Sequence, residues 1–187
     1  MNKGPENPVT TEELAAAMPS ILSAPRDAGI VRMICTRPKP NTRNFPEVIT
    51  LTRLKGVSND YHPDQPWLEL DDGSADSRIE VSILPWRVLD LCWRERDRVM
   101  HPGDNIAVDM LLSETDLPTG TLLSVGTAVV EVSDVPNDGC VKWKVRCGRD
   151  AYKWIITPEN LKLRLRGLYA RIVQDGEVRV GDVLRKV

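Results

Sequence analysis

The feature that most constrains the fold is the second half of the chain, where short apolar runs alternate with turns rich in glycine. These runs cover residues 122–125, 127–132, 167–173, 177–180 and 183–187. Short runs of Val, Ile and Leu bounded by Gly, Pro, Asn and Asp are typical of β-strands. Glycines at the ends of such runs suit the corners of a barrel. We therefore predict a mainly β fold of the α+β class, with a β-barrel and a few short helices.

The first half of the chain adds further strands and helices. A capping box formed by Thr10 and Glu13 begins the first helix, and Pro19 should end or bend it. The other expected strands are 29–36, 47–54, 78–84 and 107–112, and the expected helices are 11–18, 86–98 and 150–156. We expect residues 1–28 to form an N-terminal helical extension and residues 29–187 to form the barrel domain.

Two local patterns near the carboxyl end make sharper predictions. Residues 161–166 alternate strictly between leucine and a basic residue, which predicts a strand with Lys162, Arg164 and Arg166 on one face. That face is either an anion-binding surface or simply solvated. The dipeptide Asp175-Gly176 predicts a β-hairpin turn.

Composition excludes several classes of protein. The net charge of −2 argues against non-specific nucleic-acid binding, which needs a basic surface. No apolar run is long enough to span a bilayer, and the N-terminus lacks a signal-peptide pattern. We therefore expect a cytoplasmic protein with no membrane partner. The cysteines are expected to be reduced and not part of a zinc site, since they form no paired C-x-x-C pattern; they are Cys35, Cys92, Cys140 and Cys147.

Cys140 is the candidate reactive residue. It follows the apolar run 127–132 and a Pro-Asn-Asp-Gly turn, and Lys142, Lys144 and Arg146 come directly after it. A thiol at a strand end among cations would be deprotonated readily and could ligate a soft metal. The alternative is a half-buried structural cysteine.

The turn-rich segment 55–76 contains a cluster of polar residues. Asn59, Asp60 and His62 lie within four positions of one another. They could surround a ligand, or they could be Asx-turn formers beside a surface histidine. The residues alone leave both interpretations open.

Five motifs, taken in this order, resemble the MOSC family, the domain shared by molybdenum-cofactor sulfurases and amidoxime-reducing proteins. They are Gly-x-x-Asn-Asp-Tyr-His at 56–62, Pro-Gly-Asp-Asn-Ile at 102–106, the run 125–132 that leads to Gly139-Cys140, and the segments 166–173 and 176–182. The resemblance extends from about Gly29 to Val187. The chain departs from the family by having Gly-Cys where Pro-Cys is frequent, Asp104 where Glu is frequent, and a changed loop at 58–62.

The resemblance implies a closed β-barrel that binds the molybdenum cofactor, molybdopterin. A cysteine matching Cys140 would be the catalytic residue and the metal ligand. Guanidinium and ammonium groups would recognise the cofactor's phosphate. The candidate cofactor-binding residues are Asn59, Asp60, His62, Asn105, Lys142, Arg146, Arg164, Arg166 and Arg171.

The implied activity is reduction of a small N-hydroxylated substrate. The sequence has no ferredoxin-like cysteine cluster and no flavin fingerprint, so the electrons should come from a separate donor protein. Two alternatives stay open. The chain could carry the cofactor, or sulfur as a persulfide on Cys140, without turnover. It could also be a non-catalytic barrel that has lost the cofactor.

Overall fold

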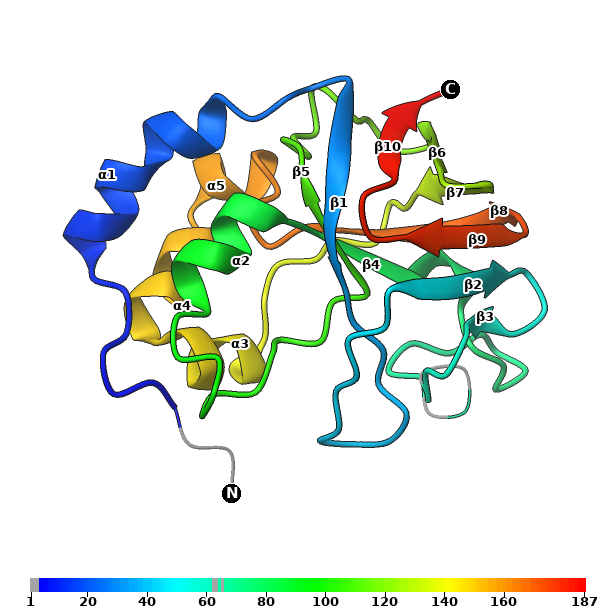
Figure 1. Cartoon of the computed structure of the whole chain (residues 1–187), viewed down its shortest axis with the longest axis horizontal. Helices are drawn as coiled ribbons and strands as arrows, with labels where there is room; N and C mark the ends of the chain where they lie inside the picture. Colours follow the sequence, from blue (N-terminus) through cyan, green and yellow to red (C-terminus); the bar gives the residue numbers. More distant parts are fainter. Residues whose placement is uncertain (1–3, 62–63, 65) are drawn as a thin grey trace.

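The centre of the molecule is a closed β-barrel (Figure 1). The computed structural model describes residues 4–61, 64 and 66–187, and within these residues seven strands close the barrel. Around it they run in the order β1 (Ala28–Ile34), β10 (Val183–Lys186), β6 (Leu122–Val125), β7 (Ala128–Val132), β8 (Leu168–Gln174), β4 (Val81–Pro85) and β5 (Ile106–Asp109). Strand β5 pairs back with β1, and only β4 and β5 are parallel neighbours.

Period-2 alternation determines which side chains fill the barrel. In β7, Ala128, Val130 and Val132 are buried, whereas the intervening Val129 and Glu131 are only partly buried. Successive side chains of a strand point to opposite faces, so one set of small and branched residues lines the interior. The resulting core is continuous and apolar. This arrangement confirms the predicted mainly β, α+β fold with a closed barrel.

A second, three-stranded sheet lies beside the barrel, in the order β3 (Gly56–Val57), β2 (Val48–Thr52) and β9 (Gly176–Arg179). The hairpin predicted at Asp175-Gly176 is wrong, because β9 pairs with β2 and not with β8. Both edges of β8 are already occupied by β4 and β7. The chain must therefore leave the barrel after β8.

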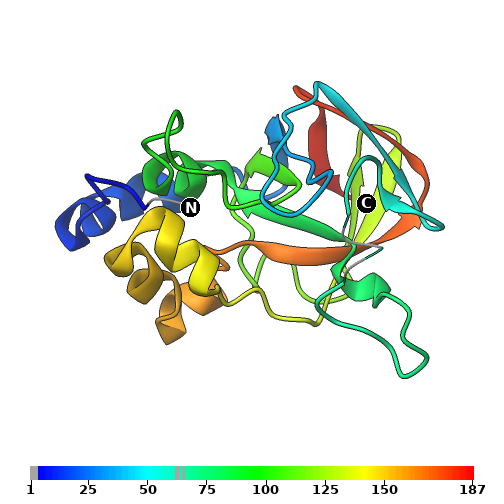
Figure 2. The ribbon, with the colours of Figure 1, turned by 90° about the horizontal axis from the view of Figure 1, so that it is seen from below.

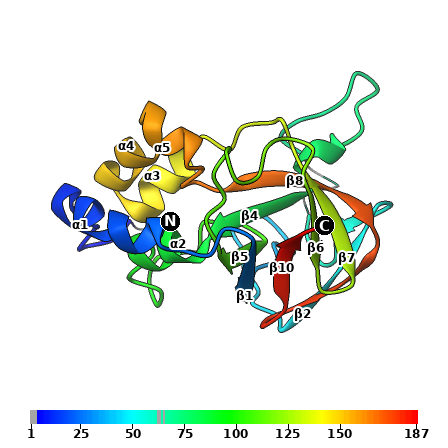
Figure 3. The ribbon, with the colours of Figure 1, turned by 90° about the horizontal axis from the view of Figure 1, so that it is seen from above.

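A layer of short helices covers one side of the barrel, as Figures 2 and 3 show. The helices are α1 (Thr11–Leu22), α2 (Trp86–Cys92), α3 (Val141–Cys147), α4 (Arg149–Ile155) and α5 (Pro158–Lys162), with a 3₁₀ turn, η1 (Ser77–Ile79), before β4. They pack around a second apolar cluster. Helix α1 contacts α2 and α4, and the proposed division at residues 28 and 29 stays a prediction. Within the described part of the chain, no helix has the length and apolarity to cross a membrane.

The three expected helices are present, with different ends. The capping box at Thr10 and Glu13 is confirmed in both directions. Helix α1 continues past Pro19 to Leu22, because a proline in the last turn removes only one late hydrogen bond. Helix α2 ends at Cys92 and not near residue 98. Directly after this end, the indole N–H of the buried Trp93 donates to the Val99 carbonyl at 2.7 Å.

The strand predicted at 161–166 is wrong. Pro158 stands at the first position of α5, which runs through Lys162, and Arg164 has a left-handed backbone with a φ of 49°. The closed barrel leaves no free edge with which these residues could pair, so the leucine alternation does not form a strand. The common basic face predicted for this segment therefore does not exist.

Candidate functional site

Cys140 stands at the beginning of α3 and not at a strand end. The segment 133–140 crosses from the end of β7 to the helical layer, and Cys140 occupies the N-cap position with an extended backbone. Gly139 before it has a φ of 91°, and a Cβ there would lie 2.8 Å from the side chain of Ile155. A glycine is needed at this position so that the chain can turn against α4 and present the next side chain.

The exposure of Cys140 distinguishes it from the other cysteines. Cys35, Cys92 and Cys147 are buried, and Cys140 is exposed. Burial raises the pKa of Cys35 and of Cys92 to about 12, and it raises the pKa of Cys147 well above its usual value. These buried thiols stay protonated at neutral pH. Of the four cysteines, only Cys140 is accessible for ligation or modification.

Two adjoining pockets open at Cys140. The larger has a volume of about 470 Å³ and the smaller about 120 Å³. Both are lined by Trp67, Cys140, Lys142, Arg166 and Tyr169. The smaller pocket extends between further polar groups: Arg37, Arg43, Tyr61, Ser82 and Asp104. The thiol therefore opens onto a concave wall that carries Lys142 and Arg166, and two further arginines line the smaller pocket.

Arg166 connects the helical layer to the barrel inside this wall. Its Nη1 donates to Asp104 Oδ1 at 2.6 Å, and its guanidinium lies 4.7 Å from the ring centre of Trp143 on α3. Burial acts to lower the pKa of Arg166 and is the largest single effect, but the charge and the hydrogen bond of Asp104 act together with other nearby groups to raise the pKa overall. Arg166 Nε and Asp104 Oδ2 are buried without a partner in the described structure. Gly167 lets the chain pass so close to β4 that a Cβ would lie 2.1 Å from the Ile83 carbonyl oxygen.

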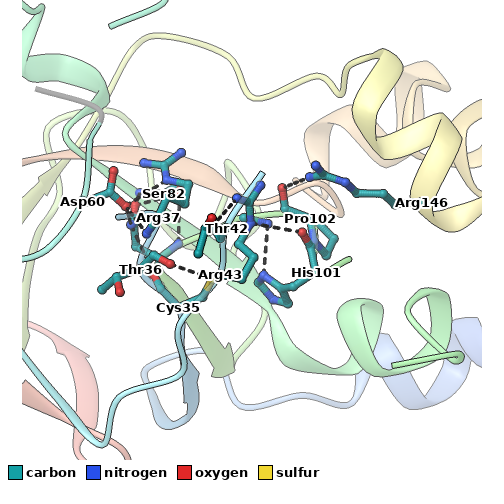
Figure 4. Close-up of polar contacts among 12 residues, drawn as sticks. Cys35, Thr36, Arg37, Thr42, Arg43, Asp60, Ser82, His101, Pro102 and Arg146 are labelled. Atoms are coloured by element: carbon teal, nitrogen blue, oxygen red, sulfur yellow. Dashed lines mark hydrogen bonds and ion pairs between the residues drawn. The ribbon is translucent and has the colours of Figure 1, made fainter. Parts of the chain in front are cut away.

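The turn at 101–105 places Arg43 and Asp104. The Nδ1 of the buried His101 accepts a hydrogen bond from the Gly103 N–H at 3.0 Å, and burial lowers the pKa of His101 to about 3. Gly103 has a φ of 108°, and a Cβ there would lie 2.8 Å from Arg43 Nη2. In Figure 4, Arg43 lies over this turn; its Nε donates to the His101 carbonyl at 3.3 Å.

Asn105 ties together the floor of the site. Its Oδ1 accepts from the N–H and the hydroxyl of Ser82 on β4, at 3.1 and 2.9 Å. Its Nδ2 donates to Asp60 Oδ2 at 3.1 Å and to the Cys35 carbonyl at 3.4 Å. Asp60 also accepts from Arg37 Nε at 2.8 Å, which helps to raise the pKa of Arg37 against the opposing effect of burial. One buried amide thereby links β1, β4 and the 58–61 loop.

The structure brings only part of the predicted set together. Cys140, Lys142 and Arg166 line the pockets, and Asn105 and Asp60 lie beneath them around Arg37. These five residues form one connected site.

The other predicted residues lie elsewhere. Arg146 lines neither pocket, and its Nη1 donates to the carbonyl of Pro102, at the rim of the smaller pocket, at 2.7 Å (Figure 4). Arg164 lines a separate pocket, where its Nη1 donates to the Leu117 carbonyl. Arg171 pairs with Glu131 at 2.7 Å on the outside of the barrel. Asn59 is exposed and lines neither pocket, and His62 is outside the described residues.

Several pocket residues were not predicted from the sequence. They are Arg37, Arg43, Tyr61, Trp67, Asp104 and Tyr169. Tyr61 and Asp104 stand within the motifs at 56–62 and 102–106, so these motifs could have identified both residues. Arg37 and Arg43 flank a proline-rich link after β1 and give no signal, because only folding carries them to α3.

The donor set limits what the site can hold. No group of three or more His, Cys, Asp or Glu side chains suited to a metal is present in residues 4–61, 64 and 66–187. A metal bound by Cys140 would have one protein thiolate as a ligand. Its other ligands would have to come from a bound group. The surrounding arginines and lysine suit an anionic, multidentate group.

Comparisons with known proteins agree with this fold. The model of the MOSC domain matches residues 87–185. YuaD of Bacillus subtilis is 14% identical with a TM-score of 0.54, and the match covers 84% of this chain and 94% of that one. YiiM of Geobacillus stearothermophilus is 19% identical with a TM-score of 0.52, over 86% of this chain and 75% of that one. No curated protein matches in sequence. The matched segment spans more than half of the chain and includes Asp104, Cys140 and Arg166, and the chain therefore belongs to the MOSC domain family.

Proposed function

We propose that this protein binds the molybdenum cofactor and reduces N-hydroxylated compounds, with Cys140 as the protein ligand of the metal. The observation that carries the proposal is the position of the single exposed cysteine at the mouth of two cationic pockets. The MOSC family supports the cofactor, and the electrons would come from a separate donor protein. Substrate and donor are inferred from the family resemblance.

The residues present fit molybdopterin. The cofactor brings its own dithiolene sulfurs, so one protein thiolate would complete a soft ligand set, and among the described residues no group of three or more His, Cys, Asp or Glu side chains competes with it for a metal. Its phosphate is matched by Arg166 and Lys142 on the shared wall, with Arg37 and Arg43 in the deeper pocket. The unpartnered Nε of Arg166 is a buried donor available to such a ligand. When bound, the group supplies the two-electron chemistry that removes oxygen from the substrate.

The chain's own residues orient the ligand and control its surroundings. Asp104 and the Trp143 ring hold Arg166 in place, so the guanidinium does not have to be ordered on binding. Burial raises the pKa of Tyr169 to about 12, so its hydroxyl stays protonated and can donate a hydrogen bond into the pockets. The ring centres of Trp67 and Tyr169 lie 5.7 Å apart, and Trp67 adds an apolar surface to both pockets.

The exposure of Cys140 also favours a second function, transport of sulfur as a persulfide without turnover. Such a persulfide would form when the Cys140 thiolate takes the outer sulfur from the persulfide of a donor protein and the donor's own thiolate leaves. This exchange needs neither an electron donor nor a reducible substrate. The two functions separate when reduced methyl viologen is added with an N-hydroxylated base. A reductase consumes the electrons, and a carrier does not.

Replacement of Cys140 tests the proposal. We expect Cys140→Ser, produced in a host that makes the cofactor, to lose reduction of an N-hydroxylated base or amidoxime, because a protonated serine oxygen is a poor ligand for this metal. Molybdenum and released pterin are measured per chain, together with viologen-driven activity.

Cys92→Ser is the matched control. It buries a hydroxyl in the helical cluster and should lower the free energy of unfolding by about 1–3 kcal/mol while activity is kept. Full activity in Cys140→Ser would end the thiolate assignment. A purified parent chain without molybdenum would favour a barrel that has lost the cofactor.

A further inference from the structure

The outward face of α3 carries an unusual set of exposed side chains. Val141 is 76% exposed and Val145 is 41% exposed, although both are apolar. They are four positions apart, which places them on the same side of the helix. Lys142 and Lys144 are exposed beside them. We call these four residues the α3 face.

The α3 face adjoins the mouth of the site. Cys140 caps the helix, and Val141 and Lys142 line the larger pocket together with Trp67, which is itself 58% exposed. At a rise of about 1.5 Å per residue, the whole face lies within roughly 8 Å of Cys140 along the helix axis. A molecule seated on it would cover the approach to the pockets.

The charge of the α3 face is opposite to that of the chain as a whole. The protein has a net charge of −2, yet α3 contains no acidic residue, and both of its exposed charges are lysines. The nearest exposed carboxylate in sequence is Asp138, on the other side of Cys140. Apolar side chains within a charged rim are typical of small, transient protein interfaces, where complementary charge speeds association.

We propose that the α3 face is the docking surface for the electron donor, a small carrier protein with a carboxylate-rich rim around its redox centre. The inference rests on the proposed function, which requires electrons from another protein. The two lysines attract the acidic rim, and the two valines exclude water at the centre of the contact. Docking there brings the donor's redox centre next to Cys140.

The test pairs a variant of the face with a matched variant elsewhere. Lys144→Glu with Val145→Asp reverses charge and polarity on the face and leaves Lys142 unchanged, because Lys142 lines the pockets. The control is Leu54→Asp with Lys55→Glu, which makes the equivalent change at an exposed Leu-Lys pair between β2 and β3, far from α3 in Figure 1. Binding of an oxidised acidic flavodoxin and of an oxidised plant-type ferredoxin to the full chain is measured by calorimetry.

We expect the parent to bind at least one of these carriers, with an affinity that falls as salt rises. The face variant should bind about tenfold or more weakly, and the control should bind as the parent does. The rate driven by reduced methyl viologen should be the same in all three chains, because this small donor needs no docking surface.

Binding of neither carrier by the parent would overturn the proposal, as would equal affinity of the parent and the face variant. Equal weakening by the control would also overturn it, since that result would reflect overall charge. A parent that shows the expected binding pattern but has no viologen-driven activity would support the docking surface and contradict the proposed reductase.

Discussion

The barrel and the helical layer contribute to the site in different ways. The barrel side supplies Asp104 and Asn105 from the turn before β5, held by several hydrogen bonds to β1 and β4. The helical side supplies Cys140 from the N-cap of α3, and Arg166 comes from the turn between α5 and β8. The polar floor is thus built on paired strands, and the exposed thiol is carried by a short helix that takes no part in the strand pairing.

The difference shows where the site can be disturbed. Strand pairing fixes the floor, whereas the position of Cys140 depends on how α3 is fastened to the barrel. The ion pair of Arg166 with Asp104 and the contact of Arg166 with Trp143 form one link between the two regions, and the hydrogen bond from Arg146 to the Pro102 carbonyl forms another.

The largest effect is expected from cutting the link at Arg166. Arg166→Met leaves Asp104 buried and unpaired, which should lower the free energy of unfolding by about 3–5 kcal/mol. Arg164→Met, two positions away in a different pocket, should cost only about 1–2 kcal/mol for one lost hydrogen bond. Denaturant unfolding of both variants measures the contrast.

A double variant provides the control for this prediction. Arg166→Met with Asp104→Leu removes both charges and should recover most of the stability, because no unpaired charge remains. Cofactor retention should stay low in the double variant and normal in Arg164→Met. Equal pterin content in the double variant and the parent would show that Arg166 serves only the fold.

A smaller effect is expected where the chain passes from the helical layer back into the barrel. Gly167→Ala adds a Cβ 2.1 Å from the Ile83 carbonyl at a φ of 90°, so backbone must move, at a cost of about 2–5 kcal/mol. Gly120→Ala is the control, since Gly120 has a similar φ of 85° but open space around it. It should lose about 1–2 kcal/mol. Similar thermal shifts in the two variants would contradict the close contact.

The smallest effect concerns pH and the turn that places Asp104. His101 has a pKa lowered to about 3 in the folded chain, against 6.5 when unfolded. Its contribution to stability is therefore fully present above pH 6.5 and is lost as pH falls, because only the unfolded state takes up the proton. Between pH 7 and pH 5 the loss should be about 2 kcal/mol.

His101→Gln checks this pH dependence. The variant should be less stable than the parent at pH 7, because the Gly103 N–H loses its partner. Its stability should nevertheless change less between pH 7 and pH 5. Parallel pH profiles for the parent and the variant would assign the acid lability to other groups.

The sequence was most informative about the barrel. Alternation in residues such as Ala128, Val130 and Val132 identified strands, because each strand buries one face and the pattern is visible locally. The helical layer was harder to predict. Neither α3 nor α5 was recognised, since each is only a few residues long, and the leucines before Arg166 fit a strand pattern equally well.

The candidate site shows the same division. Cys140, Lys142 and Arg166 were identified from motifs and local charge, and they do share a wall. Arg37 and Arg43 were not identified, because their place beside Asp104 depends on the path of the 37–44 link and on the missing side chain of Gly103.

The amino-acid sequence by itself determined the class of fold and the capping of the first helix, and it marked Cys140 as the candidate reactive residue, because each depends on residue type and near-neighbour spacing. The tertiary structure alone decided that Arg164 and Arg166 line different pockets, that β9 leaves the barrel, and that Arg37 meets Cys140 across a cavity. Closure of the barrel occupies both edges of β8 and leaves no edge for residues 161–166. That constraint acts between residues far apart in the chain, so no local pattern records it.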